Sequence, residues 1–260
     1  MIPKVIHYCW FGGKRKPKLI KDCILSWKIH LPDYEIKEWN EKNSDLTIPF
    51  VNEAYKLKKW AFVADYIRLK ILYENGGIYL DTDMMVIKSF DSLLSDECFF
   101  GVEDERFISA GIIGVKKKHP FIKKCLFKYE SIKLDSKTDW NQITMPIFIT
   151  GLFRDLFSFD SSFEKTLKYE MITIYPVSYF YPFPNKKKHD INNYKNYIEN
   201  STFAVHLWNA SWVEYDEFYF FKNREYFKGF LMSFRKIFYD GKISFSYMKK
   251  IFLSIKISLK

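Results

Sequence analysis

The sequence predicts an α/β fold with a partly parallel sheet, and three observations near its start support this. The apolar run KVIHYCWF ends at Gly12 and Gly13, which predicts a buried strand followed by a turn. Residues 17–31 then carry apolar side chains at helical spacing, bounded by Pro17 and Pro32. The stretch YEIKEWN alternates as a second strand. Strand, helix and strand in this order favour a sheet with parallel neighbours.

The alternation of helices and strands continues to about residue 215. The strongest helix prediction covers residues 53–75, and Gly76 and Gly77 supply its left-handed cap. A strand over 78–87 follows directly from that helix. The other predicted elements are strands at 99–104, 109–117 and 171–176, a last core strand and a turn within 202–212, helices at 119–132 and 151–157, and a polar mobile loop at 185–196.

Composition limits the class of protein and its partners. A chain of 260 residues with 48% hydrophobic content is long enough for one large domain with an appendage. The formal net charge of +10 predicts an anionic partner: a nucleotide, a phospholipid surface, a nucleic acid or an acidic glycan. Aromatic residues make up 20% of the chain, which fits an aromatic core or a surface that stacks on sugars, bases or lipid.

Cysteine usage and the N-terminus predict a cytoplasmic protein. The four cysteines form no CxxC pair, which argues against a zinc ribbon or thioredoxin-type site and suggests buried thiols in a reducing compartment. The first residues lack the order of a signal peptide, since the basic cluster follows the apolar stretch. No run reaches the ~18 apolar residues of a spanning helix. Contact with the inner face of the cell membrane stays compatible with this interpretation.

Two aspartates at the end of an apolar strand carry most of the functional prediction. Asp81 and Asp83 lie between the apolar runs IYL and MMVI, where unpaired charge is costly to bury. On a continuous strand both side chains would share one face; on a strand that ends there, both can project beyond its carboxyl edge. Oxygen ligands suit hard divalent cations, which commonly bridge carboxylates to phosphates. The pair therefore predicts a Mg²⁺ or Mn²⁺ site, against the alternative of two solvated acids.

Four further positions are candidates on weaker signals. Asp65 and Arg68 share a helix face within an apolar stretch, so they predict either a surface ion pair or a half-buried pair that holds a ribose hydroxyl and a phosphate. Trp10, beside the first glycine pair, is either a core residue or a ring that stacks on a base. His206 on the strand VHLW is a core histidine unless the fold returns that strand to the aspartates.

In combination these segments resemble glycosyltransferase family thirty-two, the DXD-sugar-binding group. The resemblance rests on IPKVIHYCWFGG, LPDYEIKEWN, AFVADYIRLKILYENGGIYLDTDMMV and HLWNASW, which occur in order over residues 2–213. The group includes yeast outer-chain mannosyltransferases and bacterial capsular-polysaccharide enzymes, and it is similar to the glucosylating domain of the large clostridial toxins. The resemblance implies a GT-A fold with a Rossmann-like mixed sheet, a nucleotide-sugar donor, a divalent cation and retention of anomeric configuration.

The resemblance also implies roles for individual residues. Trp10 would stack on the donor base, Asp65 and Arg68 would lie at the donor sugar and phosphate, and Tyr79 would line the same pocket. Asp83 would be the firm metal ligand, Asp81 would contact ribose, sugar or metal, and His206 would be a further ligand. Ser211 and Trp212 would close over the diphosphate. One departure concerns the acceptor side, where the family often has Asn and this chain has Ser109 and Ala110 in ISAGIIGV.

These residues lead to a predicted reaction. The enzyme would move a sugar from a nucleotide donor, with UDP favoured, to a glycan or lipid-linked glycan acceptor in surface polysaccharide synthesis. No carboxylate nucleophile is evident, so a front-side reaction is expected. A phosphatase of the haloacid-dehalogenase type is a second enzyme hypothesis, although Met85 departs from its pattern. A basic nucleic-acid binder is a non-enzymatic hypothesis that the acidic pair opposes. The oligomeric state is not predicted.

The last part of the chain has a different character. A boundary is expected at 215/216, with a GT-A catalytic domain over 1–215 and a basic, aromatic, helical extension over 216–260. Within it, residues 241–260 place apolar and basic side chains at roughly helical spacing. This pattern predicts either a helix lying on an anionic membrane or one packed on the catalytic domain or a second subunit.

Overall fold

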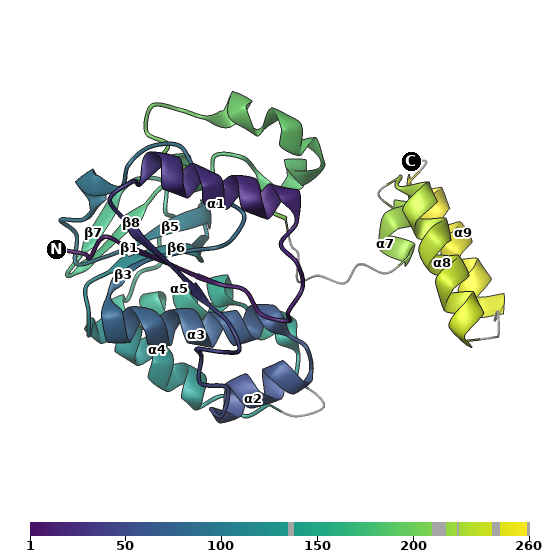
Figure 1. Cartoon of the computed structure of the whole chain (residues 1–260), viewed down its shortest axis with the longest axis horizontal. Coiled ribbons are helices and arrows are strands. Elements are labelled where there is room, and N and C mark those ends of the chain that lie inside the picture. Colours follow the sequence, from purple (N-terminus) through teal and green to yellow (C-terminus); the bar gives the residue numbers. More distant parts are fainter. Residues whose placement is uncertain (135–137, 210–216, 223, 241–244, 259–260) are drawn as a thin grey trace. The chain divides into compact units, whose positions relative to one another are not determined.

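The computed structural model describes residues 1–134, 138–209, 217–222, 224–240 and 245–258 (Figure 1). The chain divides into two compact units, Met1–Asn209 and Ala210–Lys260. The boundary expected at 215/216 lies in a stretch outside the described residues, so it stays a prediction. All four cysteines are buried free thiols.

A mixed sheet forms the centre of the first unit and confirms the predicted α/β fold. Its strands are β1 Val5–Cys9, β2 Glu35–Trp39, β3 Gly77–Leu80, β5 Cys98–Asp104, β6 Phe107–Val115, β7 Leu167–Tyr169 and β8 Ile172–Tyr175. They are ordered β2-β1-β3-β6-β5-β8-β7. β1 runs parallel to both β2 and β3, whereas β6 is antiparallel to β3 and β5. At the far side β8 is parallel to β5 and antiparallel to β7. Two short strands, β4 Met84–Val86 and β9 Ala204–His206, pair in a separate small sheet.

Helices cover both faces of the main sheet. They are α1 Lys18–His30, α2 Pro49–Lys56, α3 Trp60–Asn75, α4 Pro120–Glu130, α5 Met145–Phe157 and the short α6 Val177–Phe180, with 3₁₀ turns η1 Asp91–Leu93, η2 Trp140–Ile143 and η3 Asn185–Tyr197. α1 lies on one face, and α3, α4 and α5 lie on the other (Figure 1). Alternation along β3 serves both layers: Ile78 and Leu80 pack with Trp27 of α1, and Tyr79 joins the core under α3.

The single helix predicted over 53–75 is wrong, because α2 ends and α3 begins within it. Lys58 takes a left-handed conformation with φ 56°. Its N–H donates to the Tyr55 carbonyl at 2.9 Å, and the Lys59 N–H donates to the Ala54 carbonyl at 2.8 Å. These two bonds form the Schellman pattern that ends a helix, usually on glycine. A lysine in this place gives no such signal in the sequence.

The single strand predicted over 78–87 is also wrong, and the break falls at Asp81–Asp83. Beyond it the chain leaves the main sheet and continues as β4, which packs against α1. The Trp27 indole N–H donates to the Met84 carbonyl at 2.7 Å, and the Val86 N–H donates to the Ser26 hydroxyl at 2.9 Å. The backbone of β4 pairs instead with β9 in an antiparallel arrangement, with Met84 opposite His206. Side-chain hydrogen bonds from α1 therefore replace the lost main-sheet partners.

The predicted mobile loop at 185–196 consists instead of the 3₁₀ turns of η3. Its few apolar residues recur at a spacing of three, and Ile191, Tyr194 and Tyr197 pack on a small core with Phe183 and Val205. Side chains three apart lie above one another in a 3₁₀ helix, so a polar segment can still cover a core.

The second unit confirms the predicted helical C-terminal extension. It contains α7 Glu217–Lys222, α8 Tyr226–Asp240 and α9 Phe245–Ser258. Phe221 of α7 is fully buried, and its ring lies 4.9 Å from that of Phe230. The Arg224 guanidinium donates to the Ser258 carbonyl at 2.7 Å, which joins the start of α8 to the end of α9.

A tight turn between α3 and β3 delivers the chain to the candidate site. Gly76 and Gly77 both have positive φ, and a Cβ on Gly77 would lie 2.8 Å from the Val5 carbonyl oxygen, so only glycine fits. His7 of β1 holds the turn, since its Nε2 contacts the Gly76 carbonyl at 3.0 Å while its Nδ1 accepts from the Trp39 indole at 3.1 Å. Burial lowers the pKa of His7 from 6.5 to about 4.

We predict that His7 makes stability sensitive to mild acid. The folded state favours the neutral ring, so its contribution is complete above pH 6.5 and is lost as the pH falls toward 4. The loss approaches about 3 kcal/mol in the free energy of unfolding. Urea denaturation at several pH values should show a steeper acid decline for the wild type than for His7→Gln. The exposed His189→Gln should behave as wild type; equal slopes for all three proteins would contradict the prediction.

Candidate functional site

The fold brings two predicted site segments to one edge of the main sheet. In the sheet β1 lies between β2 and β3. The chain passes from β1 through α1 to β2, whereas α3, which precedes β3, covers the opposite face of the sheet from α1. In open α/β sheets this reversal of strand order creates the ligand-binding crevice at the carboxyl ends of the strands. Trp10 directly follows β1 and Asp81 directly follows β3, so both lie at that switch point.

An irregularity in β6 completes the floor of the site. Phe100 of β5 pairs with Ile113, yet the next residue, Gly101, pairs with Ser109, so extra residues of β6 bulge at this point. Bulges of this kind redirect groups next to functional sites. The Gly111 carbonyl accepts the Asp81 N–H at 2.7 Å. A Cβ on Gly111 would lie 3.1 Å from an Asp81 carboxylate oxygen, so a side chain there would fill the site.

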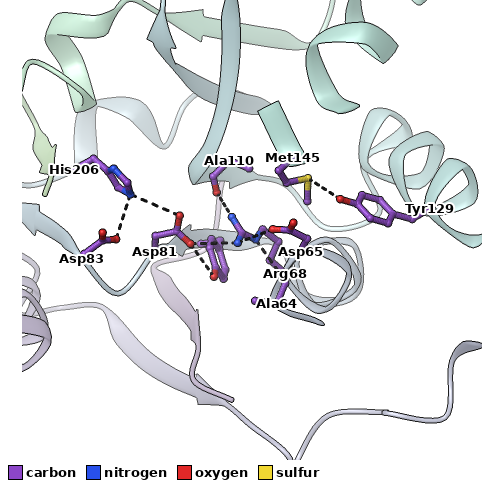
Figure 2. Close-up of polar contacts among 10 residues, drawn as sticks. Ala64, Asp65, Arg68, Asp81, Asp83, Ala110, Tyr129, Met145 and His206 are labelled. Atoms are coloured by element: carbon purple, nitrogen blue, oxygen red, sulfur yellow. Dashed lines mark hydrogen bonds and ion pairs between the residues drawn. The ribbon is translucent and has the colours of Figure 1, made fainter. Parts of the chain in front are cut away.

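Arg68 of α3 is a buried cation that fixes Asp81. Its Nη2 lies 2.9 Å from the Asp65 carboxylate and 3.3 Å from the Asp81 carboxylate, and its Nη1 donates to the Ala110 carbonyl at 2.7 Å. Figure 2 shows this row of side chains from Asp65 to Asp81. The guanidinium also lies over the Tyr79 ring at 4.4 Å. The planar fork thus engages three partners at once, which a lysine could not do.

Tyr79 and Asp65 are buried supports within this network. The Tyr79 hydroxyl donates to Asp81 at 3.2 Å, although the residue is only 1% exposed. Burial raises the pKa of Asp65 to about 7, against the opposing attraction of Arg68. In this arrangement Tyr79 and Arg68 orient Asp81, and their predicted contact with a donor stays a prediction.

Asp83 and His206 form the second half of the site. Because β9 pairs with β4, the fold does return the histidine strand to the aspartates, the condition under which His206 became a candidate ligand. Its Nε2 lies 3.2 Å from the Asp83 carboxylate and 3.9 Å from that of Asp81 (Figure 2). The Asn209 N–H donates to the other Asp83 oxygen at 2.7 Å. Three groups from two sheets therefore converge.

These three side chains have the composition of a cation site. Ligand atoms of Asp81, Asp83 and His206 lie within 4.8 Å of one another. The Asp81 side chain is 29% exposed, so the cluster opens to solvent on that side. Burial by itself would raise the pKa of Asp83, but His206 and the Asn209 N–H hold that pKa below its usual value. Burial by itself would lower the pKa of His206, but the nearby carboxylates outweigh burial and raise that pKa above its usual value. Two carboxylates and an imidazole suit Mn²⁺ or Mg²⁺.

The remaining predicted residues are placed less completely. Trp10 is partly buried at the edge, with its indole N–H donating to the Lys14 carbonyl at 2.6 Å and the Lys16 ammonium 5.5 Å from its ring. Ser211 and Trp212 lie outside the described residues. Ser109 is buried on β6, close to the bulge.

Two residues of the site were missed in the sequence. Glu103 lies on β5 two positions after Gly101, where a Cβ would touch the Tyr181 ring at 2.8 Å. Burial raises the pKa of Glu103, and the carboxyl group interacts with His206 and Asp81. The buried Tyr181 ring lies 5.5 Å from that of His206. An acid within the apolar strand FFGVED was the available signal for Glu103.

Several proteins with similar sequences are named as sugar transferases. Residues 17–100 match the family described as a glycosyltransferase sugar-binding region containing a DXD motif. The chain is 28% identical over 158 residues to lactosylceramide 4-alpha-galactosyltransferase of Mus musculus, covering 56% of this chain and 40% of that protein. It is 31% identical over 133 residues to inositol phosphoceramide mannosyltransferase 3 of Schizosaccharomyces pombe, covering 46% of this chain and 35% of that protein. The chain thus spans well under half the length of these relatives.

A solved structure supports the same fold. The PaToxG glycosyltransferase superposes with a TM-score of 0.51 at 21% identity, covering 60% of this chain and 70% of that one. The mixed sheet and this likeness define an α/β fold of the GT-A type. The structure thereby confirms the predicted fold class, and the sequence likenesses support the predicted class of enzyme, a sugar transferase.

We predict that Arg68→Met destabilises the fold by about 3–5 kcal/mol, because it leaves the Asp65 carboxylate buried without its partner. Urea denaturation would measure this loss. The double variant Asp65→Leu, Arg68→Met should recover part of it, since no charge is then left unpaired. As a control, Lys18→Met breaks the exposed pair with Asp22 and should cost less than about 1 kcal/mol. A loss that small for Arg68→Met would show that the pair is solvated.

Proposed function

We propose that this chain is a metal-dependent, retaining glycosyltransferase of the family thirty-two type. It would transfer a sugar from a nucleotide-sugar donor, with UDP favoured, to a glycan or lipid-linked glycan. The observation that carries the proposal is the convergence of Asp81, Asp83 and His206 at the switch point of the sheet. A structural ion pair would need no such opening toward solvent at Asp81.

The proposed cation fits the side chains that would hold it. Asp81 and Asp83 would supply carboxylate oxygens, and His206 would supply Nε2. Across the site the carboxylates of Asp81, Asp83 and Glu103 outnumber the nearby cationic groups, so added positive charge is favourable. When bound, Mn²⁺ or Mg²⁺ would stabilise the negative charge that develops on a departing diphosphate.

The protein's own groups would orient the reactants. Arg68 and Tyr79 hold Asp81 in one position, and Asn209 does the same for Asp83. As the bond from the sugar to the diphosphate breaks, its electron pair stays on the phosphate oxygen. The acceptor oxygen forms the new bond to the sugar on the face that the diphosphate leaves, and the proton of the acceptor hydroxyl passes to the departing phosphate oxygen. Glu103 would accept a hydrogen bond from the acceptor hydroxyl and direct it, in place of the asparagine often found near Ala110 in the family.

The acceptor we propose is a lipid-linked glycan at the inner face of the cell membrane, as used in surface or capsular polysaccharide synthesis. The two relatives described above are named for lactosylceramide and for inositol phosphoceramide. Those names support a lipid-borne acceptor, whereas the donor sugar is left to experiment. A thermal-shift panel of UDP- and GDP-sugars, each with and without Mn²⁺, would identify the donor.

We predict that Asp83→Ala abolishes both sugar transfer and hydrolysis of the donor, and removes the Mn²⁺-dependent part of the thermal shift with UDP. A loss of at least about 100-fold is expected for removal of a group that holds charge at the transition state. The exposed Asp22→Ala, on α1, is the matched control and should keep full activity. Unchanged turnover in Asp83→Ala would eliminate the proposed metal site.

We predict a different result for Glu103→Gln. Because this side chain is expected to contact the acceptor hydroxyl and is not among the three proposed metal ligands, transfer should fall by about 10- to 100-fold, with only a small change in the KM for donor and in the Mn²⁺-dependent shift. Donor hydrolysis by water should persist. Asp104→Asn, which breaks the exposed contact with Arg106, serves as control. A parallel loss of hydrolysis and transfer would assign Glu103 to the donor side.

A further inference from the structure

The second unit exposes far more apolar surface than it buries. Among the described residues of 217–258, only Phe221 and Ile251 are buried large apolar side chains. Ten others are exposed: Phe227, Phe230, Leu231, Phe234, Phe238, Phe245, Met248, Phe252, Leu253 and Ile257. A unit this small has little core of its own, and contiguous apolar surface of this kind marks an interaction site.

The exposed side chains of α8 form one continuous stripe. They recur at the spacing i, i+3, i+4, i+7 and i+11, which places them on a single helix face. We call them the α8 stripe: Phe227, Phe230, Leu231, Phe234 and Phe238. Phe227, Phe234 and Phe238 are 82%, 70% and 88% exposed. The opposite face packs inward, since a Cβ on Gly229 would lie 2.8 Å from Phe221 of α7. Phe230 lies at the edge of the stripe and touches Phe221, whereas Phe227, Phe234 and Phe238 point away from the unit's own core.

Basic residues accompany the stripe. Lys228 and Arg235 each follow a stripe residue by one position and are exposed along its flank. On α9 the exposed Lys249 lies between Met248 and Phe252, and the exposed Lys256 lies between Leu253 and Ile257. Such mixing of Phe and Leu with Lys and Arg is typical of helices that lie in the headgroup layer of a bilayer. Within the described residues, no helix is long and apolar enough to cross a membrane.

Charge decides which partner the stripe fits. Residues 217–260 contain ten Lys and Arg and three Asp and Glu, a formal +7. Residues 1–209 contain 31 Lys and Arg and 26 Asp and Glu, a formal +5. Both the catalytic unit and a second copy of the chain are therefore basic and would repel this unit. An anionic lipid surface complements both its charge and its apolar stripe.

We propose that the α8 stripe, together with the adjoining exposed residues of α9, docks the protein in the plane of an anionic membrane. The sequence alone pointed to 241–260 for this contact; the exposed side chains place its centre on α8 instead. The proposal stands on the second unit alone, so it does not depend on the proposed sugar transfer.

Vesicle co-sedimentation of the full chain tests this docking. The wild type should bind phosphatidylcholine vesicles that contain phosphatidylglycerol, bind pure phosphatidylcholine far less, and release at high salt. The triple variant Phe227→Ser, Phe234→Ser, Phe238→Ser should lower the partition coefficient by about 100-fold. Phe127→Ser removes an equally large side chain, 75% exposed on α4 of the first unit, and should bind as wild type.

Other outcomes would overturn the proposal. Equal vesicle binding by the wild type and the triple variant would do so, as would wild-type binding that does not depend on phosphatidylglycerol. Absence of vesicle binding, with a dimer in light scattering that the triple variant loses, would assign the stripe to a second copy. Absence of vesicle binding, with a lower unfolding temperature of the triple variant, would assign it to the first unit. Since all three phenylalanines are exposed, circular dichroism should show the variant folded.

Discussion

The buried guanidinium of Arg68 is the interaction on which the candidate site depends. It lies between two carboxylates, Asp65 and Asp81, and also bonds the Ala110 carbonyl of the β6 bulge. Without this cation the pKa of the buried Asp65 would rise further, and Asp81 would have no fixed direction. One side chain thus joins a helix, the end of a strand and a bulge. It lets an acidic residue be held rigidly and still be partly exposed to a ligand.

The second constraint is that Asp81 and Asp83 adjoin different sheets. Asp81 directly follows β3 of the main sheet, whereas Asp83 directly precedes β4, whose partner is β9. The distance between the two carboxylates therefore depends on a pairing between residues 84 and 206, far apart in the chain. The Asn209 N–H and His206, which lie at the same distant part of the chain, also fix the side chain of Asp83. A cation at this site would join the small sheet to the large one.

The sequence predicted the parts of this arrangement that local patterns encode. The strand before Trp10, the helix carrying Asp65 and Arg68, and the glycine turn before Tyr79 all follow from periodicity and glycine placement. The break after Asp81 was only one of two alternatives, because an apolar run does not say which sheet it joins. Lys58 ended a helix without a glycine, and the short strand β7 gave no clear alternation. Glu103 and the bulge at Gly111 depend on contacts between strands, which one sequence does not display.

The net charge of the chain needed the structure for its interpretation. A formal +10 suggested an anionic partner such as a nucleotide, yet the candidate site itself is rich in carboxylates. Most of the positive excess lies in residues 217–260, beside exposed phenylalanines rather than beside Asp81. A nucleotide diphosphate would be repelled by Asp81 and Asp83 unless a cation intervened. The candidate site and the C-terminal helices therefore have opposite electrostatic requirements. The acidic site requires a cation before it can accept a phosphate, whereas the basic helices complement an anionic surface directly.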